Sequence, residues 1–271
     1  MSDRFEKAAR MLADLRRGAK LATAFPEALA PNSIADGYAI QDRFRALWAE
    51  PVAGWKIGAT AAAVQTRFGV NEPFAGPYFS PDVFASPARP HSARFPHHCL
   101  ESEFAFRFAR RVSPRSATYG RDEIRAVIDA VLPVFEIVGP RFDTLLFSHP
   151  ATAVADCGLN AGFVLGKPVS DWLGLELSKH GVRLSVAGKV KAEGSGANVL
   201  GDPMNVLDWA VNHLSGRGIA IEPGQLISTG TTTGIAYIAP GETAIADFGT
   251  LGSVEIRFDG PPPQRLVPPP A

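Results

Sequence analysis

Glu101 and Glu103 stand two residues apart in a strand-like run, 100–108. Because successive side chains of a strand point to opposite faces, both carboxylates share one face. The other face requires a hydrophobic core, since it carries Phe104, Phe106 and Phe108. A third acid, Glu136, lies in the apolar run 134–138. Carboxylates held together by buried strands repel one another unless a cation lies among them, and their oxygens favour Mg²⁺ or Mn²⁺. The alternative is a set of solvent-facing acids, which the apolar neighbours of Glu136 disfavour.

A lysine upstream of these acids is the candidate for proton transfer. Lys56 lies between two glycines and beside a tryptophan and an isoleucine, in Gly54-Trp55-Lys56-Ile57-Gly58. Partial burial there would lower the pKa of Lys56 and suit it to move a proton or to bind an anion. The alternative is an ordinary surface lysine of a strand.

Four further residues are candidates for substrate binding. Arg141 follows Glu136 by five residues and either orients an anionic ligand or forms a structural ion pair. Asp156 lies in a Gly-containing turn, where it either supports the site or bonds its own backbone. The hydroxyls and amides around Thr229 and Gly230 either line a pocket or form a polar turn.

Two other motifs are less specific. The Gly-rich segment 194–203 precedes a helical pattern and could present backbone amides to an anion. It is not a dinucleotide fingerprint, because its flanking strand and third glycine are misplaced. His97 and His98 lie close to Glu101 in the sequence but complete no recognised metal-ligand spacing.

Composition narrows the class of protein. The chain has 271 residues, with 27 basic and 27 acidic side chains and therefore no formal net charge. That balance argues against nucleic acid or an anionic membrane as the main partner. No apolar run reaches the length of a membrane span or forms the core of a signal peptide. The two cysteines make neither a disulfide framework nor a zinc pattern, so we expect a cytoplasmic protein, with neutrality suiting a homo-oligomer.

The patterning predicts an N-terminal helical segment, a β-rich domain and a tail, with boundaries at 1–50, 51–260 and 261–271. Helical spacing runs from residue 5 to Gly18 and, after a capping signal at Ser33, to Trp48. Further helices are expected at 121–131 and after Asp202-Pro203. The tail is proline-rich. The strand candidates are 54–58, 100–110, 134–139, 162–166, 182–187, 225–229, 243–247 and 253–258.

These motifs together resemble the fumarylacetoacetate hydrolase superfamily, and within it the branch of 2-keto-4-pentenoate (2-oxopent-4-enoate) hydratases and 4-oxalocrotonate decarboxylases. They occur in the order and spacing of that family over about 38–258. The matching segments are 54–60, Gln65, 69–70, 100–106, 132–141, 154–156, 194–196, 201–203 and 228–230.

The resemblance implies an α+β fold, with a mixed β-roll or β-sandwich core and an N-terminal helical segment. Glu101, Glu103 and Glu136 match the family's three ligands for Mg²⁺ or Mn²⁺, and Lys56 matches its active-site lysine. The implied activity is a hydro-lyase of aromatic-compound degradation, which adds water to a 2-hydroxy-2,4-dienoate. The implied substrate is a small 2-keto or 2-enol carboxylate, and the implied partner subunit is a decarboxylase paralogue.

This chain departs from the family pattern at several positions. Where the family reads Ala-Asp-Asn-Ala-Ser, it reads Ala-Asp-Cys-Gly-Leu over 155–159, which replaces a polar pocket residue by Leu159. Pro140 takes the place of a serine, and a different turn precedes Asp82, so the role of Asp82 is not carried over. We expect Leu159, Phe79 and Trp55 to form apolar walls, and these changes concern the substrate more than the metal.

Three other functions compete with the hydratase. A decarboxylase of an oxalocrotonate or a hydrolase of an acylpyruvate would use the same metal site. Hydrolases of the superfamily tend to carry a His-Glu pair on a lid, for which this chain offers no clear match. A non-catalytic partner subunit is disfavoured, because all three glutamates and Lys56 are retained.

Overall fold

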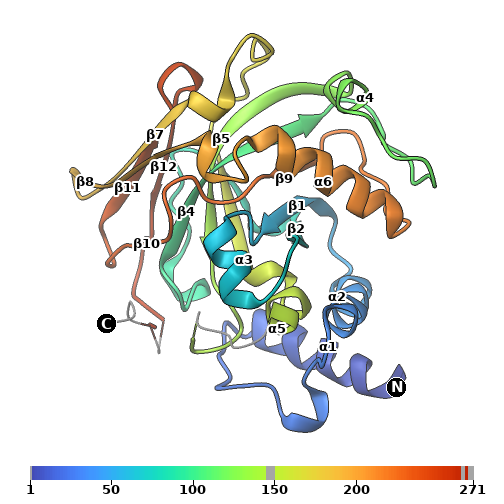
Figure 1. Ribbon diagram of the computed structural model, residues 1–271. Helices are drawn as coiled ribbons and strands as arrows, with labels where there is room; N and C mark the ends of the chain where they lie inside the picture. The colour runs from blue at the N-terminus through green and yellow to red at the C-terminus, as the bar shows by residue number, and fades with distance from the viewer. Residues whose placement is uncertain (1, 145–149, 264–265, 268–271) are drawn as a thin grey trace.

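Two β-sheets form the body of the computed structural model, which describes residues 2–144, 150–263 and 266–267 (Figure 1). The larger, mixed sheet has the order β2-β1-β9-β4-β5-β6-β3, with β10 pairing to β4, and the smaller has the order β12-β11-β7-β8. The larger sheet comprises β1 (Val52–Gly58), β2 (Phe74–Phe79), β3 (Val83–Ala85), β4 (Cys99–Phe108), β5 (Ile128–Val138), β6 (Asn160–Leu165), β9 (Leu226–Ser228) and β10 (Ala236–Tyr237). The smaller comprises β7 (Gly181–Val186), β8 (Lys189–Ser195), β11 (Thr243–Asp247) and β12 (Ser253–Arg257).

Six α-helices are present in the described part of the chain. They are α1 (Ser2–Arg17), α2 (Ile34–Trp48), α3 (Ala62–Phe68), α4 (Arg121–Arg125), α5 (Pro150–Ala155) and α6 (Pro203–Gly216). Short 3₁₀ turns are η1 (Glu27–Leu29), η2 (Ser80–Asp82), η3 (Ser92–Arg94), η4 (Cys157–Leu159), η5 (Leu177–Lys179), η6 (Gly196–Asn198) and η7 (Gly249–Leu251). The predicted α+β class with a mixed sheet is therefore confirmed. Among the described residues, no helix combines the length and the apolar character that crossing a membrane requires.

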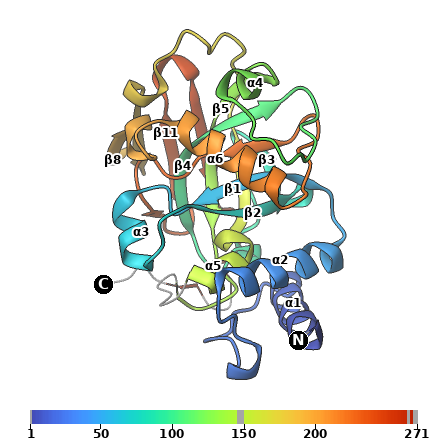
Figure 2. The ribbon, with the colours of Figure 1, turned by 45° about the vertical axis from the view of Figure 1, so that its right-hand side comes forward.

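The predicted N-terminal helices form and pack together. In both ribbon views α1, α2 and α5 lie side by side at one end of the sheets (Figure 2). The apolar stripe of α1 is buried, including Phe5 and Leu12. The side chain of Ser33 caps α2 by accepting a hydrogen bond from the amide of Asp36. The side chain of Asp202 caps α6 by accepting one from the amide of Met204. The domain boundaries at 50 and 260 stay predictions.

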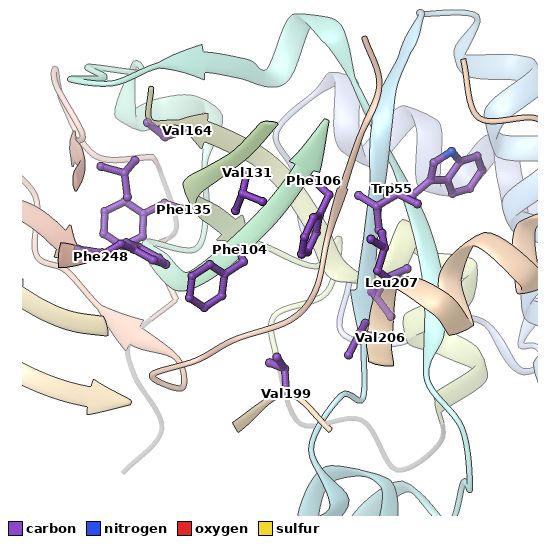
Figure 3. Close-up of a cluster of buried hydrophobic side chains, with 14 of the residues drawn as sticks. Trp55, Phe104, Phe106, Val131, Phe135, Val164, Val199, Val206, Leu207 and Phe248 are labelled. Carbon is purple, nitrogen blue, oxygen red and sulfur yellow. The ribbon is translucent and has the colours of Figure 1, made fainter. Parts of the chain in front are cut away.

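The alternation read from the sequence of β4 is confirmed. Phe104, Phe106 and Phe108 are fully buried in the main hydrophobic cluster. That cluster also contains Phe135 of β5 (Figure 3). The opposite face of β4 carries the two glutamates, so the buried phenylalanines fix the direction in which the carboxylates point.

The prediction of a helix over 121–131 is wrong in its second half. The helix α4 ends at Arg125, and β5 begins at Ile128. From Ile128 onward β5 pairs with β4 along its whole length. A long antiparallel ladder outweighs the helical preference of a five-residue segment, which cannot sustain a helix alone. The sequence patterns also missed α3, α5, β2, β3, β8 and β10.

Part of the proline-rich tail lies outside the described residues, at 264–265 and 268–271. Within the described part, the amide of Val267 donates to the carbonyl of Pro96.

Strand β2 presses against the turn η4, and a glycine makes this approach possible. A Cβ atom added at Gly76 would collide with the carbonyl of Cys157. Gly158 in turn lies close to the side chain of Lys56. The packing of β2 therefore fixes the position of η4 beside the candidate catalytic lysine.

We expect Gly76→Ala to lower the free energy of unfolding by roughly 1–3 kcal/mol, because the new methyl group overpacks the β2–η4 contact. Urea unfolding measures this loss. Gly181→Ala is the matched control, since a Cβ there meets no atom within 4 Å and should change stability by less than about 0.5 kcal/mol. Equal stabilities of the two variants would contradict the packing argument.

Candidate active site

The three glutamates singled out from the sequence lie together. Glu101 on β4 is directly opposite Glu136 on β5 in the antiparallel register, and Glu103 is two residues further along β4. One ligand oxygen of each lies within 4.8 Å of the others. Glu103 and Glu136 have no exposed surface, whereas Glu101 keeps some exposure at the cavity described below. The strand pairing thus concentrates three acids in the protein interior.

This concentration perturbs the acids strongly. Burial raises the pKa of Glu101 to about 7, a rise that Lys56 opposes and Glu136 strengthens. Burial, together with Glu136 and Glu101, raises the pKa of Glu103 well above its ordinary value. One oxygen of Glu103 is buried without any hydrogen-bond partner. Additional positive charge near these carboxylates would therefore stabilise them, and the free oxygen of Glu103 could coordinate a cation.

Lys56 supplies part of that charge. Its Nζ lies 3.1 Å from Oε2 of Glu136 and donates to the carbonyl of Gly158 at 2.9 Å. The prediction of a lowered pKa for Lys56 is wrong. Burial alone has that effect, but the carboxylates of Glu136, Glu101 and Glu103 outweigh it, so the pKa lies above its ordinary value.

The register of β1 directs Lys56 to the acids. β1 pairs with β9, and β9 pairs with β4, so Lys56 lies two strands away from Glu103. Its neighbour Trp55 points to the opposite face and is buried in the main core, where Figure 3 labels it near Leu207. Phe79 is buried against the N-terminal helices. The expectation that Trp55 and Phe79 line the site is therefore wrong, because alternation along their strands turns both side chains away.

Gly230 contributes to the site through its backbone. Its amide donates to Oε2 of Glu103 at 3.0 Å, and its φ of +92° suits glycine. A Cβ atom there would collide with the hydroxyl of Thr60. The neighbouring Thr229 is buried and donates its hydroxyl to the carbonyl of Phe104, so it holds the segment to β4.

A cavity of about 180 Å³ opens beside the cluster. Lys56 and Glu101 line one part of it, and Gly230 and Leu159 also contribute to its wall. Most of the remaining lining is apolar, comprising among others Val64, Phe68, Phe74, Val138 and Ile235. The predicted role of Leu159 as an apolar wall is confirmed. Such a cavity suits a small, largely hydrocarbon molecule with a polar head.

Arg141 and Asp156 pair with each other rather than facing this cavity. Nε and the backbone amide of Arg141 each donate to a different oxygen of Asp156 at 2.7 Å. Both residues are buried, and Arg141 lines a separate cavity that also contains Arg16 and Asp82. Of the two alternatives given for Arg141, the structural ion pair is therefore present. Substrate contact by Arg141, Asp156 or Thr229 stays a prediction.

Asn160 is a site residue that the sequence patterns missed. Its Nδ2 donates to Oε1 of Glu136 at 3.1 Å, and it is fully buried. Arg141 and Arg16 both donate to its backbone carbonyl. A polar amide four residues after Asp156, at the start of an apolar strand, was the only available signal. Asn160 orients one carboxylate of the cluster, a role that second-layer residues have in metal sites.

The weaker motifs lie elsewhere. His97 contacts the carbonyl of Phe142, while His98 contacts Ser92 and stacks on Phe258, so neither faces the carboxylates. Gly194 and Gly196 are not among the residues that line the cavity. They allow close approach to backbone carbonyls, those of Thr232 and Leu177 respectively.

The donor set fits a hard divalent cation. All three candidate ligands offer carboxylate oxygens, and the partnerless oxygen of Glu103 shows that the protein alone does not satisfy the cluster. Glu101, Glu103 and Glu136 are the residues that could hold the ion.

Comparisons with known proteins identify relatives. No protein-family model matches the chain. The chain is 29% identical over 257 residues to a 2-keto-4-pentenoate hydratase of Paraburkholderia xenovorans, covering 94% of both chains. It is 30% identical over 227 residues to a 2-keto-4-pentenoate hydratase of Burkholderia vietnamiensis, covering 82% of this chain and 84% of the relative. The solved 4-oxalocrotonate decarboxylase of Pseudomonas putida G7, complexed with magnesium and adipate, has a TM-score of 0.87, 24% identity and coverage of 96% and 98%. That structural likeness shows the same fold.

We expect Asn160→Leu to weaken Mg²⁺ binding at least about tenfold, because Glu136 loses the amide that orients it. Isothermal titration calorimetry measures the affinity, and thermal unfolding checks that the fold is kept. Glu103→Gln provides the comparison, since it removes the charge of a candidate ligand and should weaken binding further. Wild-type affinity in Asn160→Leu would show that the contact with Glu136 is incidental.

Proposed function

The chain belongs to the 2-keto-4-pentenoate hydratase family, and we propose that it adds water to a 2-hydroxy-2,4-dienoate to give a 4-hydroxy-2-keto acid. The observation that carries this proposal is the cluster of three carboxylates and Lys56 at the wall of a small apolar cavity. The cavity suits the hydrocarbon part of a diene, and the cluster suits its polar head.

The proposed cofactor is Mg²⁺ or Mn²⁺, held by Glu101, Glu103 and Glu136. When bound, such a cation supplies a Lewis acid for the two adjacent oxygens of a 2-keto carboxylate. The buried oxygen of Glu103 that lacks a hydrogen-bond partner supports this assignment. Gly230 and Asn160 would keep Glu103 and Glu136 in place, because each donates a hydrogen bond to one of the carboxylates.

Lys56 is the proposed proton carrier. Conversion of the dienol to the ketone removes the proton of the 2-hydroxyl and places one on C5. Water then adds at C4, and C3 receives a proton. The Nζ of Lys56 lines the cavity with its ammonium held between Glu136 and the carbonyl of Gly158, so it can give a proton and be recharged through the carboxylate. The apolar side chains of the wall, including Leu159 and Phe74, would cover the hydrocarbon part of a bound diene and limit its contact with water.

Charge balance is consistent with a monoanionic head group at the cluster. Three carboxylates, one lysine and one divalent cation sum to zero, so the cluster does not repel the substrate as the acids alone would. Arg141 is not needed for this balance, since Asp156 already neutralises it.

A decarboxylase or an acylpyruvate hydrolase with the same metal site is the alternative. The fold likeness to a decarboxylase keeps the first of these open. Hydrolysis requires a base that activates water against a ketone, and no histidine is among the residues that line the cavity in the described chain. A homo-oligomer, association with a decarboxylase paralogue and a place in aromatic degradation belong to the same proposal. Light scattering of the purified chain, with and without a candidate paralogue, tests the assembly.

Lys56→Ala should retain the fold and the metal yet lose at least about 100-fold in turnover, because the cavity loses its proton carrier. Stopped-flow loss of the diene absorbance gives the rate, and calorimetry with Mg²⁺ gives the metal affinity. Lys189→Ala, which removes an exposed lysine at the β7–β8 turn, is the control. A wild-type rate in Lys56→Ala would make Lys56 structural.

The reaction type is tested with a panel of substrates in the presence of Mg²⁺. We expect loss of 2-hydroxypenta-2,4-dienoate or a close analogue, with a 4-hydroxy-2-keto acid as the product and no release of CO₂. Chelation should abolish activity, and Mg²⁺ or Mn²⁺ should restore it. Faster release of CO₂ from an oxalocrotonate, or of pyruvate from an acylpyruvate, would replace hydration by one of the alternatives.

A further inference from the structure

Arg67 differs from the other arginines of the described chain because its side chain has no partner. It lines the candidate active-site cavity and is exposed, and no described residue forms a hydrogen bond or ion pair with it. Each other arginine in the described ranges has at least one such partner. A guanidinium beside a cavity whose five N–H donors have no protein acceptor can bind a planar anion such as a carboxylate.

Arg67 belongs to a different element from the three glutamates, which lie on β4 and β5. It lies in the last turn of α3, which follows β1 after a short connection (Figure 2). Along a helix each residue rises by about 1.5 Å, so Arg67 is roughly 9 Å along the axis from the N-cap Ala61. The side chains of Val64, Phe68 and Leu159 contribute apolar lining to the same cavity. The cavity thus combines acids and Lys56, an apolar wall, and an unpaired cation on a separate element.

We propose that Arg67 binds a carboxylate at the distal end of the substrate, so that the preferred 2-hydroxy-2,4-dienoate is a dicarboxylate. This inference rests on the proposed function, because the cluster must hold the 2-keto acid head for the other end of the molecule to reach α3.

The location of Arg67 makes its positive charge available to an anionic group that lies away from the cluster. Lys56 is already engaged by Glu136, and with a divalent cation the cluster itself is neutral, which leaves Arg67 as uncompensated positive charge. The favourable position of a cation at a helix C-terminus accounts for the sign of this residue. It does not account for the placement of the side chain in the cavity wall. A distal carboxylate would engage the fork of Arg67 through two hydrogen bonds while the hydrocarbon chain contacts the apolar wall.

The test uses two seven-carbon 2-keto acids that differ only at the distal end, 2-oxoheptanedioate and 2-oxoheptanoate. Their affinities for the full-length protein with Mg²⁺ are measured by calorimetry. We expect the dicarboxylate to bind the wild type about tenfold more tightly, the scale of one charge-assisted pair. Arg67→Gln should abolish this preference and leave the affinity for 2-oxoheptanoate unchanged. Lys189→Gln removes the same amount of charge away from the cavity and should keep the preference.

Equal affinities in the wild type, a preference that persists in Arg67→Gln, or no saturable binding of either acid would overturn the inference. A parallel assay compares kcat/KM for 2-hydroxyhepta-2,4-dienedioate and 2-hydroxyhepta-2,4-dienoate, and we expect the dienedioate to be preferred in an Arg67-dependent way. If neither diene is hydrated while the Arg67-dependent binding preference remains, the proposed reaction fails and the assignment of Arg67 stands. If both are hydrated equally well, the reaction stands and the assignment fails.

Discussion

Three carboxylates within 4.8 Å of one another, two of them without exposed surface, are the constraint on which the site depends. In water such acids would separate, but the antiparallel pairing of β4 with β5 holds them side by side. The surrounding structure offsets their repulsion from several directions. Lys56 comes from β1, the amide of Gly230 from the segment after β9, and the amide of Asn160 from the start of β6. Each of these elements therefore contributes one partner to the carboxylates.

The hydrophobic core makes this arrangement rigid. The face of β4 opposite the glutamates packs in the main cluster through Phe104 and Phe106, so a rotation of the strand would expose two rings. Exposure of a buried aromatic side chain costs about 1.5–3 kcal/mol, which exceeds what a single relaxed charge contact returns near the surface. The acids consequently cannot move apart without loss of core packing, and the strain of their proximity is available for binding a cation.

Whether a feature of the fold or of the site could be predicted from the sequence depends on how far apart in the chain the interacting residues are. The alternation of Glu101 and Glu103 with phenylalanines is a local property, and it correctly predicted the buried and the acidic faces of β4. The caps at Ser33 and Asp202 are local as well. The parallel pairing of β1 with β9 joins residues about 170 positions apart, and no local pattern encodes it. The same holds for Asn160, whose role depends on the pairing of β5 with β6, and for the raised pKa of Lys56, which three distant carboxylates cause. Trp55 was misplaced for a related reason, since a strand pattern gives two faces without saying which one meets the cavity.

The turn after α5 shows how distant contacts stabilise an unfavourable local conformation. Cys157, Gly158 and Leu159 all have positive φ, of 51°, 68° and 70°. For the two residues that carry a Cβ this conformation costs about 1–2 kcal/mol each. The amide of Leu159 bonds the carbonyl of Asp156, and the carboxylate of Asp156 is held by Arg141. The close approach of Gly76 confines the turn from the other side. As a result the carbonyl of Gly158 meets Lys56, and Leu159 lies in the cavity wall. The ion pair of Arg141 with Asp156 thus acts on the candidate site through the backbone, and the turn 157–159 connects Lys56 to the wall of the candidate active-site cavity.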